Sequence, residues 1–149
     1  MSLLQNFDND LKVAIKASDS LKVSVLRMVK AAVKNRQIEK RGELSEEEII
    51  SVISTLSKQR RESIEQFSKG GREDLAEKER QELAILQSYL PEQLTVEELD
   101  RLIIDAIKES SAEGIKDLGK VMRLVMSRVK GTADGKIVNQ RVRDLLEKV

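Results

Sequence analysis

The sequence contains no cysteine and no histidine. Without a thiol there is no disulfide, and without an imidazole the commonest general base and metal ligand of proteins is missing. We expect no zinc site, because zinc ligands in proteins are mostly cysteine and histidine, and we predict no cofactor and no metal. The many serines have no histidine to activate them. These absences predict a protein that has no self-contained catalytic site and acts by binding a partner.

Aromatic and turn-forming residues are also scarce. Aromatics make up 2% of the 149 residues, there is a single proline, Pro91, and there are 7 glycines. A core built from Leu, Ile, Val, Met and Ala, with 36% charged residues around it, is typical of helix bundles. Too few turn residues remain for a fold of many strands. We therefore predict an all-α protein.

No stretch of the sequence approaches the ~18 consecutive apolar residues of a membrane-spanning helix. The first residues, Met1 to Gln5, lack the basic segment and long apolar run of a signal peptide. We expect a cytoplasmic protein that makes no membrane contact.

Hydrophobic periodicity and capping signals divide the chain into seven expected helices. Four of them, at about 2–18, 20–40, 45–69 and 72–88, form an N-terminal helical domain, residues 1–93, that contains a long αα-hairpin turning at Gly70-Gly71. Three more form a C-terminal three-helix bundle, residues 94–149. Ser45 with Glu48 and Thr95 with Glu98 have the spacing of capping boxes. Asp117 is the expected cap of the sixth helix.

The hairpin places charges inside its apolar stripes. Arg60 interrupts the stripe of the third expected helix, and Glu79 and Glu82 interrupt that of the fourth. Folding the pair at the two glycines brings Arg60 opposite the two glutamates, so we predict an internal ion pair.

The C-terminal domain concentrates positive charge. From residue 116 to residue 143 there are eight basic residues against Asp117 and Asp134. Amphipathic helices need a polar outer face, so this charge can be a solvated surface; the alternative is a patch that contacts nucleic-acid phosphates. The predicted nucleic-acid-binding residues are Lys120, Arg123, Lys130, Lys136 and Arg143, with Gly119, Gly131 and Gly135 allowing close approach of a sugar–phosphate chain.

A secondary basic stripe lies on the second expected helix. Its members are Arg27, Lys30, Lys34 and Arg41, which fall within about 60° of one another at 100° per residue. The stripe is expected opposite the apolar face formed by Leu21, Val25, Met28, Val29 and Ala32. With so few aromatic side chains, stacking on bases is not the expected mode of binding at either basic surface.

Five ordered motifs carry a family resemblance. They are KQRRES at 58–63, GREDL at 71–75, YLPEQL at 89–94, DLGKVM at 117–122 and KGTADG at 130–135. In this combination, which spans nearly the whole chain, the sequence resembles the YqeY family of small bacterial proteins.

The YqeY family is similar to the C-terminal tail of GatB, one of the proteins that make up the tRNA-dependent amidotransferase. The resemblance implies a helical tRNA-recognition module, with carbon–nitrogen ligase activity using glutamine as amido donor as the family-level activity. It implies tRNA, and an amidotransferase or an aminoacyl-tRNA synthetase, as partners. A protein-interaction adaptor that does not contact RNA is the alternative, and a free-standing amidotransferase is the third hypothesis. The sequence leaves open whether the chain has enzymatic activity.

Overall fold

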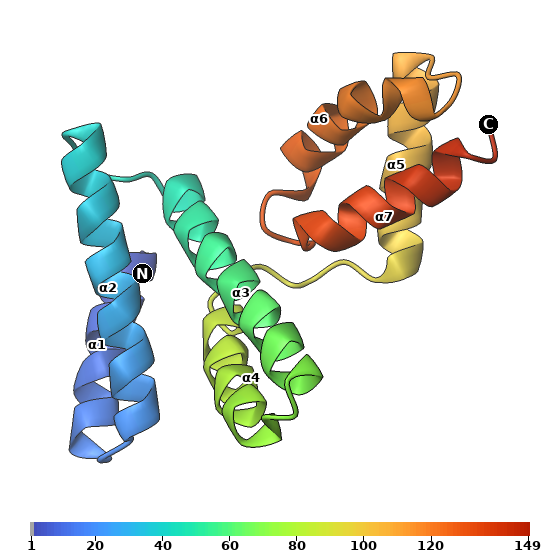
Figure 1. Ribbon diagram of the computed structural model, residues 1–149. Helices are drawn as coiled ribbons and strands as arrows, with labels where there is room; N and C mark the ends of the chain where they lie inside the picture. The colour runs from blue at the N-terminus through green and yellow to red at the C-terminus, as the bar shows by residue number, and fades with distance from the viewer. Residues whose placement is uncertain (1) are drawn as a thin grey trace. The chain divides into compact units, whose positions relative to one another are not determined.

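A computed structural model describes residues 2–149. This part of the chain contains seven α-helices, one short 3₁₀ helix and no strand, which confirms the all-α prediction (Figure 1). The helices form two compact units, Met1–Leu90 and Pro91–Val149, each with a hydrophobic core of its own.

The N-terminal unit consists of α1 (Leu3–Lys16), α2 (Ser20–Lys40), α3 (Glu46–Lys69) and α4 (Glu73–Gln87). Local capping fixes the start of α3, because the Ser45 hydroxyl accepts from the Glu48 backbone N–H and the Glu48 carboxylate accepts from the Ser45 N–H. The Lys40 ammonium, 2.6 Å from the Glu48 carboxylate, and the Ser45 N–H together lower the pKa of Glu48 to about 2. The end of α2 and the start of α3 are thus joined by an ion pair as well as by the connecting loop.

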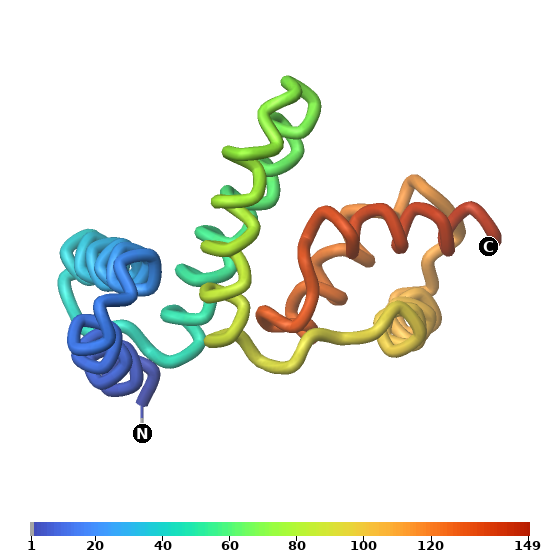
Figure 2. Tube along the Cα trace, turned by 90° about the horizontal axis from the view of Figure 1, so that it is seen from below, coloured from blue at the N-terminus to red at the C-terminus, as the bar shows by residue number. Residues whose placement is uncertain are grey.

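Helices α3 and α4 form the predicted antiparallel hairpin, whose tip extends away from α1 and α2 (Figure 2). The core of the unit lies at the base of this hairpin, where α1 and α2 pack on it. Tyr89 closes the base: its ring meets Phe7 edge-on with centroids 4.9 Å apart, and its hydroxyl donates to Asp10 at 2.5 Å. Burial, together with Asp10, raises the pKa of the Tyr89 hydroxyl. The buried core residues are Phe7, Val25, Leu26, Val29, Val33, Leu44, Ile49, Val52, Ile53 and Leu86.

The buried face of α2 differs from the predicted one. Leu26 and Val33 are fully or almost fully buried, although neither belongs to the stripe read from the sequence, whereas Leu21 is only half-buried. The face is broader and rotated because α2 packs on α1 as well as on the α3–α4 hairpin. A helix that packs against two neighbours buries a wider face than the single apolar stripe of a helix with one neighbour.

The C-terminal unit consists of α5 (Val96–Ser110), the 3₁₀ helix η1 (Ile115–Asp117), α6 (Leu118–Val129) and α7 (Gly135–Leu146), and all three α-helices pack against one another. The capping box at Thr95 and Glu98 is present as predicted. Its buried core residues are Leu99, Ile103, Ala106, Ile107, Ala112, Val121, Val125, Val129, Val138, Val142 and Leu146.

The predicted side-chain cap of α6 is wrong. Asp117 precedes α6, but its side chain makes no hydrogen bond to the first turn of that helix. Its carboxylate instead accepts from the Glu113 backbone N–H at 2.8 Å. The η1 turn already satisfies the local backbone, since the Asp117 N–H donates to the Gly114 carbonyl, and the carboxylate is used to hold the preceding loop.

Candidate nucleic-acid interface

Two arginines of the C-terminal unit define which sides of α6 and α7 face α5. Arg128 on α6 pairs with Glu109 on α5. Arg141 on α7 donates to both carboxylate oxygens of Asp100 on α5, at 2.9 and 2.7 Å, and Asp100 raises the pKa of Arg141 above its already high value. These two cations stabilise the bundle and are turned away from the opposite surface of the unit.

Four of the predicted binding residues lie on that opposite surface. Arg123 and Lys130 are seven residues apart along α6 and its cap, and Lys136 and Arg143 are seven apart on α7. A separation of seven residues keeps two side chains on one side of a helix, about 10.5 Å apart. The four side chains point about 140–160° away from the α5-facing arginines at 100° per residue, and all four residues are exposed. We refer to Arg123, Lys130, Lys136 and Arg143 as the α6/α7 basic face.

Packing between α6 and α7 brings the two halves of this face together. A Cβ atom on Gly135, the first residue of α7, would lie 3.8 Å from the Met126 Cε of α6. Met126 projects from the same side of α6 as Lys130 and is 39% exposed, so part of the surface between the cations is apolar. Asn139, which the sequence analysis missed, accepts from the Arg143 Nε at 2.9 Å. The i,i+4 spacing of these two residues on α7 was the available signal.

The turn between α6 and α7 has a backbone that needs glycine at one position. Lys130 ends α6 in the left-handed conformation, with φ of 38°, and Gly131 follows with φ of 83°. The Gln93 side chain donates to the Gly131 carbonyl at 2.9 Å, and the Leu94 N–H donates to the Thr132 carbonyl at 2.8 Å. The segment around Pro91 thus belongs to the C-terminal unit and holds this turn, a role that the YLPEQL motif did not reveal by itself.

The structural need for glycine differs among the three predicted positions. Gly131 is required by its positive φ. A Cβ on Gly135 would make only an ordinary contact, and a Cβ on Gly119, on the exposed side of α6, would have nothing within 4 Å. The fold therefore has no steric need for glycine at 119, and the backbone there is open to solvent.

Lys120 does not join the basic face. Its Nζ donates to the Ser110 carbonyl at 2.6 Å, at the C-terminal end of α5. The last carbonyls of a helix lack partners within the helix, and a lysine nearby can satisfy one of them. Its direction on α6 is about 60–80° away from Arg123 and Lys130, toward α5. Lys120 is exposed as expected from the sequence, but its ammonium makes a contact within the bundle.

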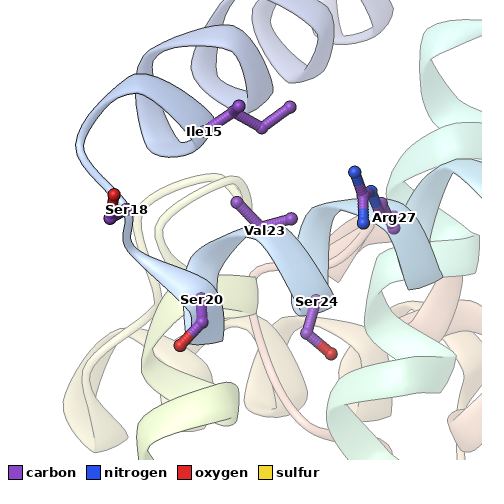
Figure 3. Close-up of a pocket in the computed structure, with 6 residues that line it drawn as sticks. All are labelled: Ile15, Ser18, Ser20, Val23, Ser24 and Arg27. Atoms are coloured by element: carbon purple, nitrogen blue, oxygen red, sulfur yellow. The ribbon is translucent and has the colours of Figure 1, made fainter.

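The secondary basic stripe of the N-terminal unit is only partly assembled. Lys30 pairs with Asp8 of α1 at 2.6 Å, and Arg41 lies beyond α2, as its left-handed cap. Arg27 lines a hollow beside the turn between α1 and α2, where Ile15 and Val23 occupy the space between the two helices (Figure 3). All four residues of the stripe are exposed, and α1 supplies the carboxylate of Asp8 to one of them.

Two further classes of site have no support in residues 2–149. No cluster of three or more acidic side chains in this part of the chain is arranged to hold a metal ion. None of the helices described there is long and apolar enough to cross a bilayer.

Comparison with known proteins identifies the family. The family model described as Yqey-like protein matches residues 4–146. The chain belongs to the YqeY-like family. The match covers both units, so the basic face and the α3–α4 hairpin are both parts of one YqeY-like sequence.

Several relatives of this YqeY-like chain are named altered inheritance of mitochondria protein 41, mitochondrial. The protein from Pyrenophora tritici-repentis is 32% identical over 97% of this chain and 81% of its own length. That from Saccharomyces cerevisiae strain YJM789 is 31% identical over 76% of this chain, and that from Eremothecium gossypii is 39% identical over 58%. The chain spans 64% and 48% of the lengths of these last two relatives.

These relatives overturn two predictions. We expected a bacterial family and a cytoplasmic protein, but the relatives are fungal proteins whose names place them in mitochondria. The motifs that carry the resemblance specify helix packing and turns, and neither property depends on the organism or compartment in which the fold is used. The bacterial prediction came from these motifs, and the cytoplasmic prediction came from the lack of a long apolar run and of a signal peptide, a lack that does not distinguish the cytoplasm from mitochondria.

Proposed function

We propose that this YqeY-like protein binds RNA through the α6/α7 basic face. The observation that carries the proposal is the separation of cations in the C-terminal unit. Arg128 and Arg141 are bound to α5 carboxylates, whereas Arg123, Lys130, Lys136 and Arg143 are exposed on the other side of the unit. Between residues 118 and 143 the only acidic residue is Asp134, so the face has a positive field.

The chemistry of this face suits the sugar–phosphate backbone better than the bases. Arginine and lysine side chains bind phosphate oxygens, and a guanidinium can donate two parallel hydrogen bonds to one phosphate. No aromatic side chain occurs after Tyr89, so the C-terminal unit has no platform on which bases could stack. The open backbone at Gly119, one helical turn before Arg123, leaves room for a sugar to approach this end of the face.

Among RNAs, tRNA is the first candidate, because the sequence resembles the C-terminal tail of the amidotransferase protein GatB. We propose recognition of tRNA shape by contacts to its backbone, as an accessory to an enzyme that acts on the tRNA. Backbone recognition of folded RNA needs no sequence-specific base contact.

The test is a salt titration of tRNA binding by the full chain and by the double variant Arg123→Gln/Arg143→Gln. Each phosphate contact contributes about 0.7–0.9 to the slope of log K against log salt, so the double variant should lower the slope by about 1.4–1.8. The matched control is Lys58→Gln/Lys69→Gln, which removes the same charge from exposed positions of α3 and should leave the slope unchanged.

Equal slopes for the wild type and Arg123→Gln/Arg143→Gln would place the RNA contact elsewhere. A loss of slope in Arg27→Gln/Lys34→Gln instead would assign it to the stripe on α2. Absence of tRNA binding by the wild type at low salt would overturn the proposal.

A further inference from the structure

A second surface of the C-terminal unit is a shallow apolar hollow of about 530 Å³ between the end of α5 and the end of α7. Its floor is made by Ile107 and Ala112, which are almost fully buried, and by half-buried Leu145. Ile104 and Val149 form its edges and are 40% and 60% exposed. Exposed aliphatic side chains around a concave apolar floor are typical of a surface that a partner covers.

Two lysines place positive charge at the border of this hollow. Lys108 of α5 and Lys148 after α7 line it, and Ser111 is its only other polar lining residue. Both lysines are exposed, and neither makes an ion pair within residues 2–149. No acidic side chain lines the hollow.

The hollow is separate from the α6/α7 basic face. Ile104 and Lys108 lie on α5, and Leu145 projects from the α5 side of α7, close in direction to Arg141. A ligand in the hollow and an RNA on the basic face would therefore contact different sides of the same three-helix unit.

We propose that this hollow binds an acidic amphipathic helix of a partner protein. An apolar groove between two helices accepts the apolar face of a third, with anchors at i, i+3, i+4 and i+7. Lysines at both edges attract carboxylates that flank such a stripe and repel a basic helix, so charge selects the partner while apolar contact supplies most of the affinity. The inference goes beyond RNA binding: it makes the C-terminal unit a module that can hold an RNA and a protein together.

The experiment uses the full chain and a designed helical peptide of about 18 residues, with leucines at i, i+3, i+4 and i+7 and flanking glutamates. Its counterpart carries lysine at every glutamate position. Fluorescence anisotropy gives the affinities, and methyl NMR of Ile, Leu and Val locates the contact. We expect shifts at Ile104, Ile107, Leu145 and Val149, and binding of the lysine peptide that is at least about tenfold weaker.

Charge reversal provides the decisive variant. In Lys108→Glu/Lys148→Glu the preference should reverse, so that the lysine peptide binds more tightly than the glutamate peptide. The matched control is Lys58→Glu/Lys69→Glu, which makes the same change in net charge on α3 and should keep the wild-type preference. A second pair tests the apolar edge: Ile104→Gln should weaken binding about tenfold, whereas Ile137→Gln, at an exposed position of α7 outside the hollow, should not.

The proposal would be overturned if the glutamate peptide caused no methyl shifts in the hollow, or if the two peptides bound with equal affinity. Displacement of the peptide by dodecanoate bound in the hollow would also overturn it, because the occupant would then be a small amphiphile. Self-association of the wild type that is lost in Ile104→Gln would overturn it as well, because the occupant would then be a second copy of this chain. Because the peptide measurements contain no RNA, and the tRNA titration contains no peptide, failure of either proposal leaves the other standing.

Discussion

The Arg60 Nε lies 2.9 Å from the Glu82 Oε2, across the α3–α4 hairpin, and 3.4 Å from the Glu79 Oε2. The side chains of Arg60, Glu79 and Glu82 are only 17%, 20% and 13% exposed. The guanidinium also contacts the Met28 sulfur, so the cluster joins the hairpin to α2. The internal ion pair predicted from the sequence is confirmed, with both glutamates sharing one arginine.

Replacing Arg60 should destabilise the protein more than replacing any surface lysine. In Arg60→Ala two mostly buried carboxylates lose their cation, and we expect the free energy of unfolding to fall by about 2–3 kcal/mol, below the 3–5 of a fully buried pair because some solvent reaches the cluster. Urea denaturation followed by circular dichroism measures this change. The control is Lys69→Ala, which removes an exposed i,i+4 pair with Glu65 and should cost about 0.5 kcal/mol or less. If the free energy of unfolding fell no more in Arg60→Ala than in Lys69→Ala, the cluster would contribute no more to stability than an exposed ion pair.

Ionisation of Glu79 should make the free energy of unfolding depend on pH. Burial, followed by the charge of Glu82, raises the pKa of the Glu79 carboxyl above its ordinary value of 4.5 in spite of Arg60. A carboxyl with a raised pKa contributes stability that is present below pH 4.5 and is lost as the pH rises through its folded-state value. The variant Glu79→Gln cannot ionise at this position. Its free energy of unfolding, relative to that of the wild type, should therefore rise as the pH increases from 4.5 to 7. Parallel stability curves for the two proteins over this range would contradict the prediction.

Replacing Gly119 by alanine should raise the stability of the protein and lower its affinity for RNA. Its backbone is helical and a Cβ there meets nothing, so Gly119→Ala should stabilise the fold by about 0.5–1 kcal/mol. If RNA approaches the open backbone of α6, the same methyl group should weaken tRNA binding about threefold or more. Ser51→Ala, on the exposed side of α3, is the control for added helix propensity and should leave the affinity unchanged. Unchanged tRNA affinity in Gly119→Ala would remove this part of α6 from the interface.

Lys120 should behave as a helix cap. Because its ammonium bonds the Ser110 carbonyl at the end of α5, Lys120→Gln should lower the free energy of unfolding by about 0.3–1 kcal/mol. The slope of log K against log salt for tRNA should stay within error of the wild-type slope. A slope reduced by about 0.7–0.9 would show that Lys120 contacts a phosphate.

Much of the local structure could be read from the sequence, because it depends on residues within one or two helical turns. The capping boxes at Ser45 and Thr95 begin α3 and α5 through contacts three residues apart, and Gly70-Gly71 ends α3 for reasons of backbone geometry. The pairing of Arg60 with the glutamates also followed, since an antiparallel hairpin of two regular helices has only one register once its turn is known.

Contacts between distant segments were decided by the tertiary structure alone. Leu26 and Val33 became core because α1 packs on α2, and Asp8 took Lys30 out of the basic stripe for the same reason. In the C-terminal unit, Glu109 and Asp100 of α5 pair with Arg128 and Arg141, on the sides of α6 and α7 that face α5. Periodicity places a cation on a helix face, but which neighbouring helix covers that face depends on how the helices pack. The sequence therefore determined the helices, their ends and the positions of the cations along them, while packing against α5 determined which of those cations pair with α5 carboxylates.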